Sequence, residues 1–248
     1  MKLALQLYSV RDALSPDRID ETLRSVREMG YDGAEWPGLI GYTPYEIKTH
    51  MELSDLELFS IHISLHDIEA PDTAMLDAFA GIGIRYLPIG WLPEECLADG
   101  ARFAGICEKI KAFSHEAGKR GMRVLYHNHD FDLARFGDQT KLDALYEALP
   151  TEVLGAELDT CWLYSGGVDA VAYIEKYADR SPIIHLKDCV REGGRKGFMP
   201  VGAGVLDWDG ILRASGGAEW LCVEQDEPSD GKTSAECAKE SIQYLKNR

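Results

Sequence analysis

Histidine and charged side chains recur at a spacing of two in three short apolar segments in the second half of the sequence. The three pairs are His127 with His129, Glu157 with Asp159, and His185 with Lys187. Side chains at positions i and i+2 of a β-strand share one face, so each pair would point in one direction. Imidazole and carboxylate groups gathered in one open site suit a divalent ion such as Mn²⁺, Mg²⁺, Co²⁺ or Zn²⁺. We therefore expect metal-assisted chemistry, with Glu224 at the end of a fourth apolar segment as a further member.

Other side chains at the ends of apolar segments are candidates for contacts with a substrate. Those in the first half of the chain are Glu35, His62 and Trp91. We expect His62 to line the mouth of the site, with Glu157 and Lys187 facing the substrate from the other side. For Lys187, an ion pair with Glu157 or Asp159 is the alternative, because a buried ammonium group needs a negative partner.

Short apolar runs alternate with amphipathic stretches along the whole chain, a pattern typical of a parallel sheet covered by helices. We expect strands over Leu3–Tyr8, Asp32–Trp36, Leu58–Ile63, Tyr86–Ile89, Arg123–His127, Leu154–Leu158, Ile183–Leu186 and Trp220–Val223. The helices expected after them cover Ile19–Met29, Thr43–Leu53, Asp72–Ala80, Ala101–Lys119, Leu142–Leu149, Asp169–Tyr177, Trp208–Ala214 and Ser234–Lys246. Eight strand–helix units in this length predict a single (β/α)₈ TIM barrel domain over residues 1–248.

An open doubly wound sheet is the competing fold. Such a sheet usually has a glycine-rich phosphate-binding turn after its first strand, and the segment Tyr8–Ala13 contains no glycine. The reactive groups of a TIM barrel lie at the carboxyl ends of its strands, where the candidates fall here. The glycine-rich stretch Gly193–Gly204 is expected to form a long loop after the seventh strand. Within it, Gly202 and Gly204 indicate a plain flexible loop rather than a phosphate cradle.

The composition excludes several classes of partner. The formal net charge is −16, and so acidic a surface repels nucleic acid and anionic membranes. The sequence contains no run of about 18 apolar residues that would span a membrane, and its N-terminal segment lacks the features of a signal peptide. Six scattered cysteines without a CxxC pair indicate reduced thiols. We expect a cytoplasmic protein with a small-molecule partner, and a homo-oligomer is left open.

Six motifs follow one another in an order typical of a known family. They are LQLYSVRD, YHNHDFD, AELDTCW, IIHLKDC, PVGAGVLDW and WLCVEQDEP. Together they resemble the sugar phosphate isomerase/epimerase family of the xylose isomerase-like TIM barrel superfamily, whose members include inosose dehydratase, hydroxypyruvate isomerase and ketose 3-epimerase. The resemblance covers essentially the whole chain, and it is specific for the family rather than for a substrate.

The resemblance implies one divalent metal ion, Mn²⁺ before the others, held by four residues at strand ends. Asp159, His185 and Glu224 match three of the ligand positions. The fourth belongs to strand five, where the epimerases have glutamate; here it falls on His127, with His129 and Glu157 as alternatives. A branch of the superfamily that repairs abasic DNA is less similar, because Trp162 stands where that branch has histidine.

The implied activity is that of a metal-dependent isomerase or epimerase acting on a sugar or sugar derivative through an enediolate intermediate. Glu224, His127 and His129 are the catalytic candidates. We expect one strand-five histidine to be the principal base, because a metal ion lowers the pKa of a carboxylate bound to it. Two alternatives are left open. One is a metal-dependent lyase or dehydratase acting on a keto-inositol or a 3-keto-glycoside, and the other is a non-catalytic sugar-binding barrel.

Overall fold

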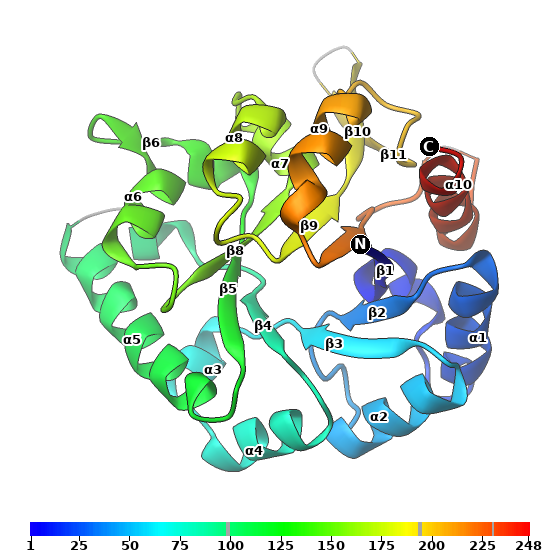
Figure 1. The fold of residues 1–248 in the computed structure, drawn as a ribbon, viewed down its shortest axis with the longest axis horizontal. Coiled ribbons are helices and arrows are strands. Elements are labelled where there is room, and N and C mark those ends of the chain that lie inside the picture. The colour runs from blue at the N-terminus through cyan, green and yellow to red at the C-terminus, as the bar shows by residue number, and fades with distance from the viewer. Residues whose placement is uncertain (98–99, 193–194, 230) are drawn as a thin grey trace.

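Eight parallel strands close into a barrel at the centre of the molecule (Figure 1). The computed structural model describes residues 1–97, 100–192, 195–229 and 231–248. The barrel strands are β1 (Lys2–Gln6), β2 (Gly33–Trp36), β3 (Glu57–Ile61), β4 (Tyr86–Ile89), β5 (Arg123–His127), β8 (Gly155–Asp159), β9 (Ile183–Leu186) and β12 (Trp220–Val223). Each pairs with the barrel strands before and after it, and β12 returns to β1. The predicted (β/α)₈ TIM barrel is confirmed.

Helices surround the barrel and cover its outer face (Figure 1). They are α1 (Ile19–Met29), α2 (Pro44–Leu53), α4 (Thr73–Gly81), α5 (Gly100–Gly118), α6 (Lys141–Ala148), α8 (Ala170–Lys176), α9 (Trp208–Ala214) and α10 (Ser234–Lys246). The predicted helices agree with these to within one residue at each end. Local signals explain part of this agreement: the Thr43 hydroxyl accepts a hydrogen bond from the Glu46 N–H, and the Glu46 carboxylate accepts one from the Thr43 N–H.

Two strands end earlier than predicted. β1 ends at Gln6, and Leu7–Ala13 forms a 3₁₀ helix whose first turn is held by a hydrogen bond from the Tyr8 N–H to the Gln6 side chain. β3 ends at Ile61, so His62 lies just beyond it. Both early ends put polar side chains at the mouth of the barrel.

Several short elements were not predicted. Two helices, α3 (Leu65–Glu69) and α7 (Thr160–Ser165), follow β3 and β8. Two antiparallel hairpins consist of β6 (Arg135–Phe136) with β7 (Gln139–Thr140), and β10 (Asp188–Glu192) with β11 (Arg195–Met199). The loop expected over residues 193–204 is therefore wrong for 195–199, while Gly193 lies outside the described residues. Backbone hydrogen bonds hold such a hairpin, so a glycine-rich, charged segment can form one without apolar alternation.

The barrel interior is apolar toward the amino ends of its strands and polar toward the carboxyl ends. The rings of Phe59 and Trp220 stack with 3.9 Å between centroids and 8° between planes, and Leu125 and Ile183 belong to the same buried cluster. Side chains two positions further along each strand also point inward. Strand alternation therefore places the polar pairs from the second half of the sequence inside the barrel, beyond the apolar cluster and nearer the carboxyl ends of the strands.

The carboxylate of Asp188 holds the chain that returns from the β10–β11 hairpin. It accepts hydrogen bonds from the backbone N–H groups of Cys189, Gly202, Gly204 and Leu206 and from the Trp208 indole. The Gly202–Gly204 segment thus cradles an anion, but the anion is a side chain of the protein. Its interpretation as a plain flexible loop is wrong, because a fully buried carboxylate fixes it.

The six cysteines are all free. Within the described ranges, none of the helices combines the length and the apolar character that a membrane span requires.

Substituting Gly204→Ala should lower the free energy of unfolding by about 1–3 kcal/mol, the usual cost of overpacking. A Cβ atom there would lie 2.1 Å from Asp188 Oδ1 and 2.5 Å from the Cys189 carbonyl oxygen. Urea unfolding measures the effect. The matched control is Gly105→Ala in the exposed face of α5, where a Cβ meets nothing within 4 Å and should stabilise the helix by about 0.5–1 kcal/mol. Equal effects of the two substitutions would contradict the tight packing at Gly204.

Candidate metal-binding active site

A cavity of about 830 Å³ opens where the barrel strands end. The predicted site residues that line it are His62, Trp91, His127, His129, Lys187 and Glu224. They are contributed by the ends of β3, β4, β5, β9 and β12 and the residues that follow. Substrates of TIM barrel enzymes bind at this end of the barrel, which makes the cavity the candidate site.

The four predicted metal ligands come together at the base of this cavity. Their potential ligand atoms lie within 4.8 Å of one another, and the residues are His127, Asp159, His185 and Glu224. The Nδ1 atom of His185 is 3.1 Å from Glu224 Oε2, and His127 Nε2 is 3.8 Å from the same oxygen. Because metal–ligand bonds to nitrogen and oxygen are roughly 2 Å long, one ion could contact all four groups.

Asp159 shows whether this set of residues fits a cation. Its Oδ1 atom accepts a hydrogen bond from the Trp162 N–H at 2.8 Å and so caps α7. Its Oδ2 atom is buried and accepts no hydrogen bond within the described part of the chain; the Lys187 ammonium lies 3.7 Å away. A buried carboxylate oxygen without a donor is costly, and a bound cation would satisfy it. The residues therefore fit a divalent ion.

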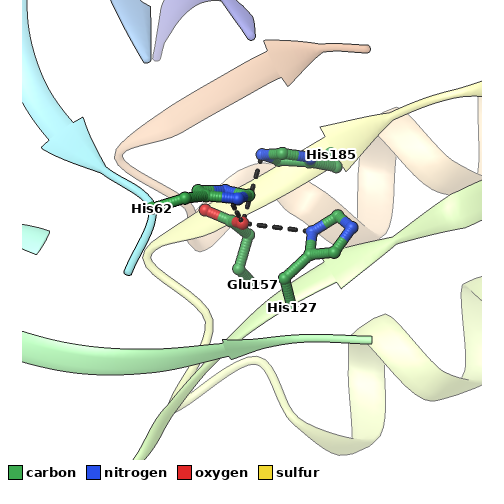
Figure 2. A group of neighbouring side chains, drawn as sticks. All are labelled: His62, His127, Glu157 and His185. Carbon is green, nitrogen blue, oxygen red and sulfur yellow. Dashed lines mark hydrogen bonds and ion pairs between the residues drawn. The ribbon is translucent and has the colours of Figure 1, made fainter. Parts of the chain in front are cut away.

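Glu157 lies behind two of these ligands, as Figure 2 shows. One of its oxygens, Oε2, is 2.9 Å from His62 Nε2, 3.1 Å from His127 Nδ1 and 3.3 Å from His185 Nε2. His127 and His185 therefore each direct one ring nitrogen toward Glu157 and the other toward Glu224. Carboxylates behind metal-binding imidazoles fix the orientation and tautomer of the ring, and Glu157 occupies that position for two rings.

The layer around Glu157 is a buried network of opposite charges. Burial opposes protonation of His62, but the charges of Glu157 and Glu35 outweigh it and raise the pKa of His62 to about 10. The same two carboxylates raise the pKa of His185 against the effect of burial. In return, His185 and His62 hold the pKa of Glu157 well below its usual range, although burial alone would raise it.

In the next layer of side chains, at the base of the cavity, positive and negative charges offset one another less evenly. Burial, opposed by Lys187 and helped by Glu224, raises the pKa of Asp159 to about 8. Burial lowers the pKa of His127, and burial together with His127 and Lys187 lowers the pKa of His129 to about 3. Both strand-five rings are therefore neutral at pH 7, the form in which imidazole binds a metal ion.

Lys187 is buried among carboxylates and also lines the cavity. Its ammonium nitrogen is 2.6 Å from Asp226 Oδ1, 3.3 Å from Glu224 Oε2 and 3.7 Å from Asp159 Oδ2. It also lies 4.6 Å from the centroid of the Trp162 ring. The ion pair expected as the alternative forms with Asp159 rather than Glu157, and Asp226 is the nearer partner.

Three side chains of the site escaped the sequence analysis. Asp226 lines the cavity two residues beyond Glu224, a spacing that could have revealed it. Gln6, at the end of β1, donates to Glu35 Oε2 at 3.0 Å and also lines the cavity. Asn128 accepts a hydrogen bond from the Asp159 N–H at 3.0 Å, a contact between β5 and β8 that no local pattern indicates.

Two residues expected to contact substrate lie deeper than predicted. Glu35 and Glu157 are fully buried, and neither is among the residues that line the cavity. Glu35 Oε2 is 2.6 Å from His185 Nε2 and 3.4 Å from His62 Nε2. The barrel stagger places both carboxylates below the mouth, where they contact the histidines. Trp91, by contrast, is 52% exposed at the rim of the cavity.

This fold belongs to a recognised family. Residues 23–248 match the model of the xylose isomerase-like TIM barrel family, and the chain is a member of that family. The resemblance stated from the motifs is thereby confirmed.

Curated relatives and solved structures extend the comparison. The chain is 23% identical over 256 residues to an inosose dehydratase from Lacticaseibacillus casei, covering 87% of this chain and 85% of the relative. A sugar phosphate isomerase/epimerase from Parabacteroides distasonis superposes with a TM-score of 0.82 at 21% identity, over 98% of this chain and 93% of that one. A D-allulose 3-epimerase from Methylomonas sp. superposes with a TM-score of 0.76 at 14% identity, over 100% and 97%.

Substituting Glu157→Gln should lower the free energy of unfolding by about 3–5 kcal/mol, the usual cost of removing one partner from a buried ion pair. The substitution removes the charge that His62 and His185 share. Urea unfolding in the presence of a chelator measures the loss without a contribution from metal. Glu175→Gln, at an exposed position of α8, is the control and should change stability by less than about 0.5 kcal/mol. A Glu157→Gln protein as stable as this control would disprove the role of Glu157 in the network.

Proposed function

We propose that this protein is a divalent-metal-dependent enzyme that isomerises or epimerises a small sugar or sugar derivative by moving a proton at a carbon beside a carbonyl group. The observation that carries the proposal is the convergence of four potential ligands beneath a cavity that could hold such a molecule. The names of the family relatives, which include an isomerase/epimerase, a sugar epimerase and a dehydratase, support the same class of substrate.

His127, Asp159, His185 and Glu224 would hold the ion, and Mn²⁺ is the ion we expect. When bound, a divalent ion polarises a carbonyl oxygen and stabilises the negative charge that develops when a neighbouring C–H bond loses its proton. Glu157 would keep the rings of His127 and His185 oriented for this purpose. The low pKa of Glu224, which Lys187 and His185 impose against the effect of burial, keeps that carboxylate charged.

The charges of the cavity favour a substrate without a phosphate group. Among the described residues that line it, Lys187 is the one lysine or arginine. Its ammonium group is already shared by Asp226 and Glu224, both of which line the same cavity. A phosphate, with a charge of about −1.5 to −2 at neutral pH, would meet these two carboxylates, and the lysine that could bind it is already paired with both of them.

His129 is our candidate for the group that accepts the proton. Its ring lines the cavity, and it is not one of the four proposed ion ligands. His127 suits the role less, because Glu157 and Glu224 face its two nitrogens. A general base must reach the proton that it removes, and His129 is the neutral strand-five ring on the cavity wall that the ion would leave free.

Dehydration is the second candidate function, and the position of Lys187 favours it. The ammonium nitrogen lies 3.3 Å from Glu224 Oε2 on the wall of the same cavity. A positioned ammonium group can give a proton to a departing hydroxyl as a general acid. Isomerisation and epimerisation conserve the mass of the substrate, whereas dehydration removes water. Mass spectrometry and NMR on a panel of keto-sugars and inososes distinguish them.

Asp159→Asn should weaken Mn²⁺ binding by more than about 100-fold, because it removes a charged ligand. Substituting residues that only hydrogen-bond to metal ligands already lowers metal affinity about 10–100-fold. The amide oxygen can still cap α7, so the fold should survive. Isothermal titration calorimetry and elemental analysis measure the loss. Asp169→Asn is a matched control, since Asp169 caps α8 in the same way on the surface. Undiminished Mn²⁺ affinity in Asp159→Asn would exclude the proposed ion site.

His129→Gln should slow exchange of the substrate C–H proton with deuterated solvent by about 100-fold or more, the usual contribution of a general base, while Mn²⁺ stays bound. NMR follows the exchange for any panel member that the wild-type enzyme turns over. His115→Gln, an exposed position on α5, is the control and should exchange at the wild-type rate. If His129→Gln exchanges normally and Glu224→Gln loses exchange with its metal retained, Glu224 is the base instead.

A further inference from the structure

We infer that the substrate carries an apolar aryl or alkyl group beside its sugar ring, so that a glycoside or a similarly substituted sugar fits this cavity better than a free sugar does. The inference rests on the proposed function, because it takes the sugar ring to lie against the charged residues. It concerns the opposite half of the same cavity, which the proposed chemistry does not use.

The lining of the cavity is divided by its origin in the chain. The charged half, with His127, Lys187, Glu224 and Asp226, is contributed by the ends of β5, β9 and β12. The other half is contributed by the first four β/α units, where apolar side chains lie beside polar ones such as Ser64, His66 and Asp67. Its apolar side chains are Leu39, Ile63, Leu65, Met75, Phe79 and Trp91.

A free sugar would leave the apolar side chains of this second group without a partner. Its hydroxyl groups need hydrogen-bond partners once water is displaced, and polar groups buried without partners are costly. Aliphatic side chains such as Leu39, Leu65 and Met75 offer none. The cavity measures about 830 Å³, within the range of about 300–1,000 Å³ that holds drug-sized ligands. The space beside the charged half therefore suits an apolar group attached to the sugar.

The backbone around Leu39 is specialised for presenting this side chain. Gly38, Ile40 and Gly41 have φ angles of 120°, 43° and 94°. The left-handed region is rare for a β-branched residue such as isoleucine, so the backbone is strained there. The loop after β2 keeps this conformation while Leu39 lines the cavity, and strained loops of this kind cluster at ligand sites.

Large apolar side chains also remain exposed at the rim. Trp91 is 52% exposed and Tyr8 41% exposed, and both line the cavity. Because both side chains line the proposed catalytic cavity, a substituent of the substrate is the occupant that would cover them.

The test compares methyl and phenyl glycosides of the same hexoses, with glucose, galactose and mannose as the sugars, on the Mn²⁺-loaded protein. Isothermal titration calorimetry should give a Kd about tenfold or more lower for the phenyl glycoside, since the ring removes apolar surface from water. Trp91→Ala and Met75→Ala should bring this ratio close to one by raising the Kd of the phenyl glycoside more than that of the methyl glycoside. Tyr45→Ala, which removes an exposed aromatic ring that does not line the cavity, should keep the wild-type ratio.

The outcomes separate this inference from the proposed function. Equal affinity for methyl and phenyl glycosides overturns the inference while sugar binding stands. Failure of every glycoside to bind while a keto-sugar or inosose is still turned over overturns the inference alone, whereas failure to turn over any keto-sugar or inosose overturns the proposed function. A ratio that survives both Trp91→Ala and Met75→Ala places the phenyl group elsewhere and overturns the inference. So does a loss of self-association in Trp91→Ala without a change in the ratio, because the rim would then be covered by a second copy of the chain.

Discussion

The site depends on one buried negative charge, the carboxylate of Glu157. It lies at the middle of the barrel, above the apolar floor of Phe59 and Trp220, where an isolated charge would be prohibitively costly. Three imidazole rings converge on one of its oxygens. Because one nitrogen of each ring faces Glu157, the other nitrogen is the one that can bind a ligand. The orientation of the rings is therefore fixed in the layer below the one where a ligand would bind.

The barrel makes this layering a consequence of simple geometry. The strands of a closed barrel are staggered, and every second residue of a strand points into the barrel. Residues at positions i, i+2 and i+4 therefore lie in successive layers of the interior. Leu125, His127 and His129 climb one strand in this way, from the floor through the Glu157 network to the cavity wall. Each strand therefore supplies a residue to the core, to the support and to the mouth, and the stability of the fold and the orientation of the site have the same origin.

The same geometry explains what the sequence could and could not predict. The alternation of apolar and polar residues is local, so the strands, the helices and the convergence of Asp159, His185 and Glu224 were predictable, and the family motifs pointed to His127. The depth of Glu35 depends on barrel stagger, which is set by pairing between strands distant in sequence. The hydrogen bond from the Asp159 N–H to Asn128 and the anchoring of Gly202 by Asp188 likewise join distant segments. Asp226 differs from these cases, because its position two residues after Glu224 could have been recognised in the sequence as a further pair on one face of a strand.

The division of the cavity between the two halves of the chain has an evolutionary consequence. Segments before β5 supply the apolar side chains of the cavity wall, while the four proposed ion ligands and the buried lysine come from β5 onward. The Glu157 network joins the two halves of the chain, because Glu35 and His62 belong to the first half. A mutation or insertion in the early loops can therefore reshape one wall while the charged network stays intact, as long as these two residues are kept. Descendants of such a barrel can acquire new ligand preferences through changes confined to those loops.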